Sequence, residues 1–189
     1  IGKQDDYVAA YGGLKYIKFS KNNTTVIPIH LKKSTSEELQ NNLLLFFIGT
    51  TRKSSTVLSK QLKKTKNLDP STLNSLHKVN SLAKDLFKSL KKSDLTQVGL
   101  ILDQGWMEKK NFTQEVSNHK IDKSYSNAIQ KGAIGGKLTG AGAGGHMLFY
   151  CEPKKQKDVK TEMKRLGLKH VDFKFYQNGP KVLDLSDLI

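Results

Sequence analysis

Residues 135–145 form the segment that most constrains how this chain can fold. Six of these eleven residues are glycine, and no other part of the 189-residue sequence approaches that density. Such a run indicates backbone conformations that are closed to other residues, or backbone that something else approaches closely. The alternative is a tight turn or bulged corner, although turns seldom need so many glycines.

Two common nucleotide-binding motifs do not fit this segment. The letters from 140 to 145 satisfy G-x-G-x-x-G, but a dinucleotide fingerprint opens a helix, whereas the apolar residues 146–151 predict a strand. A Walker phosphate loop needs serine or threonine after its lysine, and here Leu138 follows Lys137. The segment is therefore neither a Rossmann fingerprint nor a Walker loop.

Strand signals occur near both ends of the chain. β-Branched and aromatic residues at 14–19 and 26–31, with a Lys-Asn-Asn turn between them, predict a hairpin. A continuous apolar run at 43–48 predicts a central strand buried on both faces. Apolar and polar residues alternate at 171–175, which predicts a strand with one wet face that pairs with 182–185 after an Asn-Gly turn.

Helical signals fill the middle of the chain. Asp69, followed by proline, starts the clearest helix, and Asp94 caps the next one. Further helices are expected from residue 54, around 121–129 and over 153–166. Strands at both ends and helices between them predict an α+β domain, with an antiparallel sheet covered on one side by helices. The final strand–helix–strand order is typical of a ferredoxin-like split unit.

Charge and composition narrow the class of protein. The chain has 32 basic and 17 acidic residues, a net charge of +15, but its only arginines are Arg52 and Arg165. Nucleic-acid readers favour the bidentate fork of arginine, so we interpret the lysines as a solvated surface rather than a nucleic-acid face. No apolar run is long enough to span a membrane, and the single cysteine and absent secretion signal favour the cytoplasm. Five scattered histidines predict no metal site.

A second candidate site lies at the start of the chain, where Lys3, Gln4 and Asp5 precede the pair Gly12-Gly13. An acid beside an amide, ahead of two glycines, is able to position a polyhydroxylated substrate and accept its proton. Neighbouring aspartates near a chain start also fit a helix cap or a solvated loop. Because the sequence opens on isoleucine and reads at once as the middle of a structured region, we expect a fragment of a longer protein.

Together the two segments resemble the GHMP small-molecule kinases. The resemblance rests on Gly2-Lys3-Gln4-Asp5 with Tyr11-Gly12-Gly13 and, most specifically, on the run from Gly132 to Gly145. It extends over the whole chain, including Gly49-Thr50-Thr51-Arg52 and the helix at Trp106-Met107-Glu108. The closest branch comprises kinases of D-glycero-D-manno-heptose 7-phosphate, followed by fucokinase-like sugar kinases.

This resemblance implies a ferredoxin-like C-terminal GHMP kinase domain over residues 21–189, preceded by the tail end of the N-terminal kinase domain over residues 1–20. It also implies that the loop that wraps ATP lies N-terminal to residue 1. The chain alone is therefore expected to be inactive and to need the missing N-terminal part of the same protein. ATP and Mg²⁺ would be the cofactors, with their ligands largely outside this fragment.

The resemblance also assigns roles to residues. Asp5 inherits the role of general base or transition-state positioner at the sugar hydroxyl, whereas Asp6 stands where these kinases commonly carry glutamine. Arg52 is the candidate for the sugar's own phosphate, and its alternative is a surface loop arginine. The expected substrate-binding residues are Lys3, Gln4, Gly12, Gly13 and Arg52. The loop expected to lie next to the ATP phosphates, supporting the phosphate-binding loop, contains Lys137, Gly140, Ala141, Gly142, Ala143, Gly144 and Gly145.

The expected activity is ATP-dependent phosphorylation of a sugar phosphate at its anomeric hydroxyl, from heptose 7-phosphate to heptose 1,7-bisphosphate. This step would lie on the route to activated heptose for surface polysaccharide. A fucokinase-like kinase of another sugar is the alternative within the class. A basic nucleic-acid-binding fragment, driven by the charge of +15, is the alternative from a different class.

Overall fold

The computed structural model describes residues 3–49 and 54–180, and the chain divides into two compact units. One unit joins residues 1–30 to residues 174–189, and the other comprises residues 31–173. This division by compactness falls after residue 30, and the domain boundary predicted after residue 20 stays a prediction.

The first unit contains one helix and a hairpin. Helix α1 (Gln4–Tyr11) precedes the antiparallel strands β1 (Lys15–Phe19) and β2 (Thr24–Pro28), which pair from Lys15 opposite Pro28 to Phe19 opposite Thr24. The predicted hairpin is confirmed, with its second strand starting two residues earlier than expected. The ring of Tyr7 on α1 stacks on Tyr11 and meets Phe19 edge to face.

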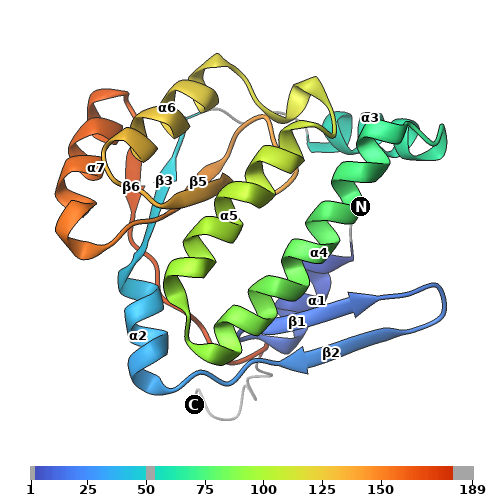
Figure 1. Cartoon of the computed structure of the whole chain (residues 1–189), viewed down its shortest axis with the longest axis horizontal. Helices are drawn as coiled ribbons and strands as arrows, with labels where there is room; N and C mark the ends of the chain where they lie inside the picture. Colours follow the sequence, from blue (N-terminus) through green and yellow to red (C-terminus); the bar gives the residue numbers. More distant parts are fainter. Residues whose placement is uncertain (1–2, 50–53, 181–189) are drawn as a thin grey trace, which may run out of the picture. The chain divides into compact units, whose positions relative to one another are not determined.

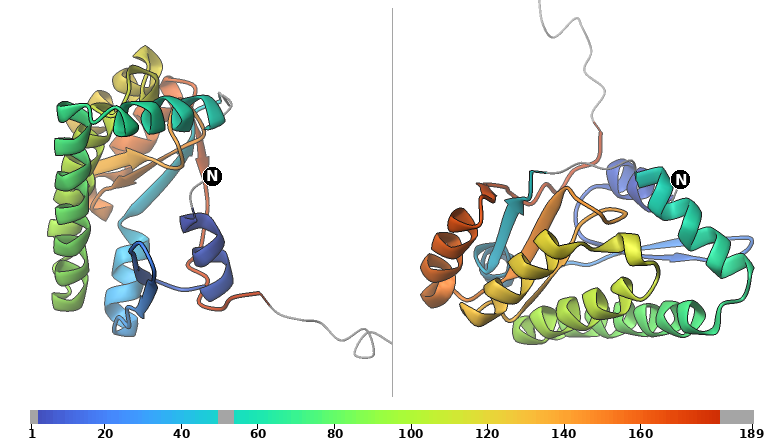
Figure 2. Two further views of the ribbon diagram at one scale, coloured as in Figure 1. Left: turned by 90° about the vertical axis from the view of Figure 1, so that its right-hand side faces the viewer. Right: turned by 90° about the horizontal axis from the view of Figure 1, so that it is seen from above.

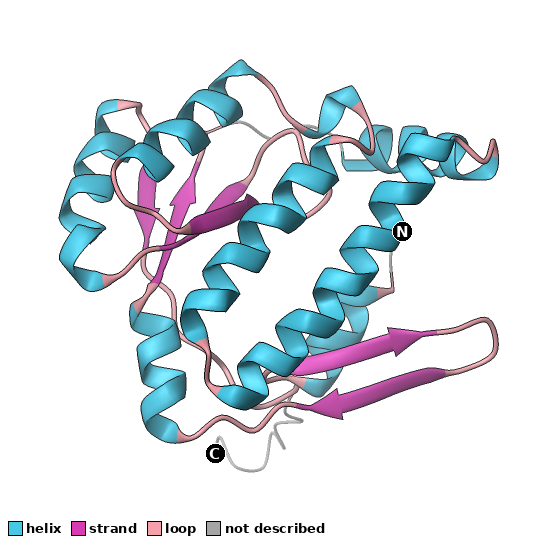
Figure 3. Cartoon of the chain, viewed as in Figure 1, coloured by secondary structure: helices cyan, strands magenta, loops and turns pink. Residues whose placement is uncertain are grey.

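The second unit is built on a four-stranded sheet (Figure 3). The strands are β3 (Leu43–Phe47), β4 (Gly135–Leu138), β5 (His146–Tyr150) and β6 (Lys169–Val171), in the order β4-β5-β3-β6. Every neighbouring pair is antiparallel, so β5 runs parallel to β6 across β3, and β3 runs parallel to β4 across β5. These two interleaved crossovers make the ferredoxin-like topology, which confirms the predicted α+β fold.

The strand predicted at 171–175 is wrong in extent, because β6 ends at Val171. Beyond that point the chain enters the first unit, where the carbonyl of Tyr176 accepts a hydrogen bond from the Gly13 amide at 3.0 Å. After β6 the chain therefore contacts the glycine pair at Tyr176. The predicted partner strand at 182–185 lies outside the described residues.

Six α-helices lie in the part of the second unit that the structure describes, residues 31–49 and 54–173 (Figure 1). They are α2 (Lys33–Asn41), α3 (Ser54–Lys66), α4 (Pro70–Lys92), α5 (Leu95–Lys110), α6 (His119–Gln130) and α7 (Pro153–Arg165). Carboxylate caps fix two starts as predicted, since Asp69 accepts from the Thr72 amide at 2.8 Å and Asp94 accepts from the Gln97 amide at 3.1 Å. Helix α2 was not predicted. No helix within residues 3–49 and 54–180 is long and apolar enough to cross a membrane.

Helices α6 and α7 cover one face of the sheet (Figure 2), and the core between them and the sheet also takes in Trp106 of α5 and Val57 of α3. Leu44 and Phe46 of β3 are buried, whereas the alternate residues of this strand are only partly covered. The prediction that β3 is buried on both faces is therefore wrong, because the side chains of a strand alternate between faces and the helices cover one of them. The core side chains of the two helices are Ile121, Tyr125, Ala128, Val159 and Met163.

Helix α5 runs unusually close to strand β4. A Cβ atom built on Gly135 would stand 2.0 Å from the Gly99 carbonyl oxygen, and one on Gly99 would stand 2.8 Å from the Tyr150 ring. Helix and strand can approach to this distance only because neither position carries a side chain. The glycine-rich segment thus begins as strand β4 rather than as the loop that its composition suggested, and its first two glycines permit close packing.

The helix offers two glycines with opposite surroundings, which gives a matched test of this packing. Gly99→Ala should lower the free energy of unfolding by about 1 to 3 kcal/mol, because its methyl group overpacks against Tyr150 and Ile134. Gly105→Ala, on the same helix, should raise it by about 0.5 to 1 kcal/mol, because no heavy atom lies within 4 Å of the added carbon. Urea unfolding of both variants measures the two changes, and equal effects would contradict this account of the contact.

Candidate active site: the glycine loop and its lysines

The loop at residues 139–145 connects β4 to β5 and takes backbone conformations that favour glycine. Gly140, Gly142 and Gly145 have φ angles of 73°, 121° and 98°, and Ala143 has a φ of 66°. Residues that carry a Cβ atom rarely adopt these φ angles. The prediction that this segment needs unusual backbone conformations is therefore confirmed.

Backbone hydrogen bonds hold the loop at three points. The Thr139 amide donates to the His146 carbonyl at 2.8 Å, and the Ile48 amide donates to the Gly145 carbonyl at 3.0 Å. Between them, the Ala143 amide donates to the carbonyl of Val116 at 2.9 Å. Val116 ends a short 3₁₀ helix, η1 (Gln114–Val116), so the loop is tied both to the sheet and to the segment after α5.

The loop combines one crowded position with two open ones. A Cβ atom on Gly142 would stand 3.0 Å from the backbone of Val116, so only glycine lets the loop pack this closely against that segment. Cβ atoms on Gly140 and Gly145 would meet no heavy atom within 4 Å. The backbone at these two positions is therefore accessible to close approach by another group, such as a phosphate.

Two lysines lie beside the loop. Lys109, in the last turn of α5, donates a hydrogen bond from Nζ to the carbonyl of Gly140. Burial, together with the positive charge of Lys137 on β4, lowers the pKa of Lys109 to about 8. Burial likewise lowers the pKa of Lys137. The predicted loop residues are thus brought together, although the side chain of Lys137 lines a cavity that it shares with Lys109.

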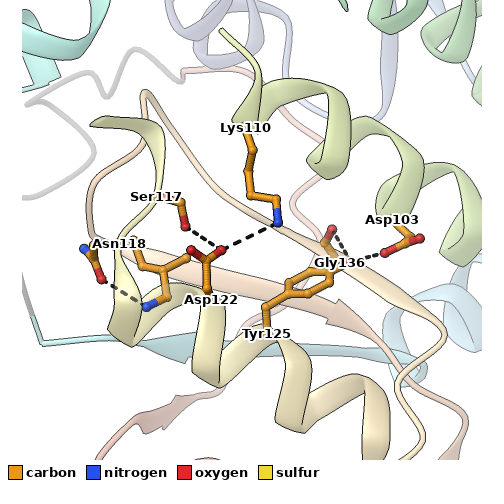
Figure 4. Close-up of polar contacts among 8 residues, drawn as sticks. Asp103, Lys110, Ser117, Asn118, Asp122, Tyr125 and Gly136 are labelled. Carbon is orange, nitrogen blue, oxygen red and sulfur yellow. Dashed lines mark hydrogen bonds and ion pairs between the residues drawn. The ribbon is translucent and has the colours of Figure 1, made fainter. Parts of the chain in front are cut away.

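A buried hydrogen-bond network fixes the strand that leads into the loop (Figure 4). The hydroxyl of Tyr125 on α6 donates to Asp103 Oδ1 on α5 at 2.6 Å, and it also lies 3.3 Å from the Gly136 carbonyl of β4. Burial and the neighbouring carboxylate of Asp103 raise the pKa of Tyr125 above its ordinary range, so its proton stays in place. The hydroxyl group of Tyr125 thus connects α6 to both α5 and β4.

A second polar group fixes the start of α6 (Figure 4). Asp122 accepts a hydrogen bond from Ser117 Oγ at 2.9 Å and pairs with Lys110 of α5 at 3.6 Å. The side chain of Asn118 caps the helix by accepting from the Ile121 amide at 3.0 Å. These contacts hold α6 next to η1, the segment on which the glycine loop rests.

Lys120 supports the end of strand β3. Its Nζ donates to the carbonyl of Ile48 at 2.8 Å and lies close to Gly49, which has a φ of 79°. Residues 50–53, which include the candidate phosphate ligand Arg52, lie outside the described residues. The predicted role of Arg52 stays a prediction.

The other predicted site residues lie in the first unit. Lys3 and Gln4 are exposed at the start of α1, and Asp5 and Asp6 are exposed in its first turn, where acidic side chains also favour the helix dipole. The pair Gly12-Gly13 packs on the returning chain, since a Cβ atom on Gly12 would stand 2.2 Å from the Asn178 backbone. The structure thus shows a packing reason for these glycines, and their predicted contact with substrate stays a prediction.

Four residues around the glycine loop were not found from the sequence: Asp103, Lys109, Lys120 and Tyr125. Each acts on a partner far along the chain, and none carries a local motif. The single sequence signal was the helical spacing that placed Tyr125 on the core side of α6. Among the described residues, no group of three or more His, Cys, Asp or Glu side chains forms a metal cluster.

This fold and glycine loop identify a class of protein. Residues 86–168 match the family described as GHMP kinases C terminal, so this part of the chain carries a GHMP kinase C-terminal domain.

Two curated proteins are similar over nearly the whole chain. The D-glycero-alpha-D-manno-heptose 7-phosphate kinase of Campylobacter jejuni is 33% identical over 95% of this chain. The bifunctional fucokinase/GDP-fucose pyrophosphorylase of Arabidopsis thaliana is 26% identical over 91% of it. The chain spans 53% of the first relative and 16% of the second.

Solved structures agree with this assignment. A D-glycero-D-manno-heptose 1-phosphate kinase from Bacteroides thetaiotaomicron matches 97% of this chain and 50% of its own with a TM-score of 0.68 and 26% identity. A putative sugar kinase from Campylobacter jejuni matches 94% of this chain and 50% of its own with a TM-score of 0.69 and 28% identity. A mevalonate kinase from L. major, 18% identical over 95% of this chain and 53% of its own, shares the fold with a TM-score of 0.69.

The partly buried position of Lys109 predicts a pH dependence of stability. Its pKa of about 8 in the folded state lies below the value of about 10.4 in an unfolded chain. The unfolded chain therefore binds more protons between these values, and the free energy of unfolding should rise with pH across this window, by about 3 kcal/mol. Chemical unfolding at pH 7.5 to 10.5 measures the rise.

The control for this prediction is an exposed lysine on α6. Lys109→Met should reduce the rise with pH, whereas Lys123→Met should leave it unchanged, since Lys123 is exposed to solvent. If the curves of both variants kept the wild-type slope, Lys109 would not carry the effect.

Proposed function

We propose that this chain supplies the C-terminal half of an ATP-dependent sugar kinase that phosphorylates heptose 7-phosphate at its anomeric hydroxyl. The observation that carries the proposal is the 33% identity, over 95% of the chain, to a protein named as a heptose 7-phosphate kinase. The glycine loop with its open backbone supports the same reading, because phosphoryl transfer depends on donors placed around the phosphates.

In this proposal the chain's own residues position the reactants. The glycine loop lies against the nucleotide's phosphate-binding loop and supports it, while Lys109 donates a hydrogen bond to the carbonyl of Gly140. Asp5 acts on the anomeric hydroxyl of the sugar, either by accepting its proton or by orienting it in line with the γ-phosphate. The remaining donors for ATP are proposed to come from a region N-terminal to residue 1.

ATP is the proposed phosphoryl donor, and Mg²⁺ would neutralise charge on its phosphates. The described residues do not fit a complete magnesium cage, because they contain no cluster of three potential ligands. Since Mg²⁺ is commonly held by phosphates and only one or two carboxylates, its ligands in this proposal belong to ATP and to residues outside this chain.

A kinase of fucose or another free sugar is the second candidate. The 26% identity to a bifunctional fucokinase supports it, although this relative is less similar than the heptose kinase. The two candidates differ in the acceptor's own phosphate, which only the heptose substrate carries. Arg52 is the residue whose replacement separates them.

The first experiment replaces Asp5 in a polypeptide that carries these residues together with the remainder of the kinase. Asp5→Asn keeps the size of the side chain and most hydrogen bonds but cannot accept a proton. Turnover should fall on the order of 10²- to 10⁴-fold, with a smaller effect on sugar binding. Single-turnover kinetics measures the chemical step.

Asp6→Asn is the matched control, because Asp6 is equally exposed in the same helical turn. A larger loss in Asp6→Asn would shift the proposed role to the neighbouring residue. If neither change slowed the chemical step, the proposed role of this helix start would be wrong.

The second experiment tests the sugar phosphate. Arg52→Ala, in the same active polypeptide, should raise the KM for heptose 7-phosphate by about tenfold or more and leave the KM for ATP nearly unchanged. A charge-assisted contact to phosphate of about 1.5 to 3 kcal/mol is the physical reason. Lys53→Ala controls for the loss of a neighbouring positive charge, and equal effects on both substrates would reject the assignment.

A further inference from the structure

A cavity of about 170 Å³ lies in the second unit beside the glycine loop, between helices α4 and α5, which run side by side (Figure 1). Its walls are mainly apolar and include Leu82 and Leu86 of α4, and Ile101, Leu102 and Trp106 of α5. The volume is similar to that of cavities known to hold a small hydrocarbon ring. The cavity can therefore accommodate a compact apolar group.

One part of the cavity wall is cationic. Lys109 and Lys137 both line it, and no carboxylate is present among the described residues that do so. Lys109 has one hydrogen-bond acceptor, the carbonyl of Gly140, and no hydrogen bond or ion pair is found for Lys137 within the described ranges. Two ammonium groups thus share a largely apolar site without a counter-ion.

The nearest acids on α5 already have other partners. Asp103 accepts the hydrogen bond of the Tyr125 hydroxyl at 2.6 Å. Glu108 accepts from Ser75 and from Lys78, each at 2.8 Å. Neither carboxylate forms an ion pair with Lys109 or Lys137. The two ammonium groups are therefore available to an anion from outside the chain. Burial without compensation is unfavourable for both ammonium groups, as the lowered pKa values of the two lysines indicate.

We propose that this cavity binds a small organic anion, a carboxylate with a compact apolar body, whose charged group is held by Lys109 and Lys137. The anion neutralises both lysines, and its apolar body fills the space between α4 and α5. Inorganic phosphate carries charge but has no apolar part to cover the apolar walls, which would stay exposed to water, so it fits less well. The site shares Lys137 with the loop predicted to lie next to the ATP phosphates, but it contains none of the proposed sugar-binding residues, and its binding is measured without turnover.

Binding at this site would act on the glycine loop through Lys109. The same ammonium group holds the carbonyl of Gly140 and would contact the anion, so a bound carboxylate keeps it protonated and in place. The ligand and the conformation of the loop are therefore coupled through one side chain.

The experiment uses the full 189-residue chain and its single tryptophan, Trp106, which lines the cavity and reports on it by fluorescence. The probe is hexanoate. Hexanol, with the same chain and no charge, and acetate, with the charge and almost no chain, are the matched controls. Hexanoate should give a saturable change and bind at least tenfold more tightly than either control. This comparison of three ligands uses the wild-type chain alone.

Variants then test the two lysines. Lys109→Met and Lys137→Met should each weaken hexanoate binding about tenfold or more, as expected for the loss of a charge-assisted contact. Lys109→Arg should retain binding, and Lys123→Met on the exposed face of α6 should bind as the wild type does. Circular dichroism confirms that each variant is folded.

Three results would overturn the proposal. They are an absent saturable response to hexanoate, equal binding of hexanol and hexanoate, and unchanged binding in both folded Lys→Met variants. None of them bears on the kinase assignment, which the turnover of Asp5 and Arg52 variants tests independently.

Discussion

The close packing of helix α5 on strand β4 is the contact from which the site is built. It exists because Gly99 and Gly135 carry no side chains, and a Cβ atom on Gly135 would stand 2.0 Å from the Gly99 carbonyl oxygen. Strand β4 leads directly into the glycine loop, and the last turn of α5 carries Lys109, which reaches that loop. The distance between helix and strand therefore sets the position of the lysine relative to the Gly140 carbonyl.

Around this contact, side-chain donors fix the backbone at three points. Tyr125 joins α6 to α5 and β4, Lys120 holds the end of β3, and Lys109 holds the start of the loop. The hydroxyl of Tyr125 is buried, so an unmade hydrogen bond there would be costly. A loop rich in glycine is entropically expensive to order, and these anchors offset that cost. The result is a rigid frame with open backbone at Gly140 and Gly145, which suits a role beside phosphates.

Much of the fold could be predicted from local signals. Asp69 and Asp94 mark helix starts because a carboxylate satisfies free amides at a helix N-terminus, and both caps are present. The extent of the last strand was predicted wrongly, because the alternation at 171–175 does not reveal that the chain packs beside Gly13. Strand β4 was missed for a related reason: glycine has low strand propensity, and only the packing of α5 explains it there.

The sequence by itself determined the resemblance to the GHMP kinases, the ferredoxin-like topology and the unusual backbone of residues 139–145, because each leaves a local mark: motif letters, hydrophobic periodicity and glycine density. Only the tertiary structure decided which side chains surround the loop. Lys109 is one of 30 lysines, and nothing in its neighbours distinguishes it from those on the surface. Its partly buried position beside Lys137 and its contact with Gly140 arise from segments about thirty residues apart, which meet because a helix and a strand pack through glycine.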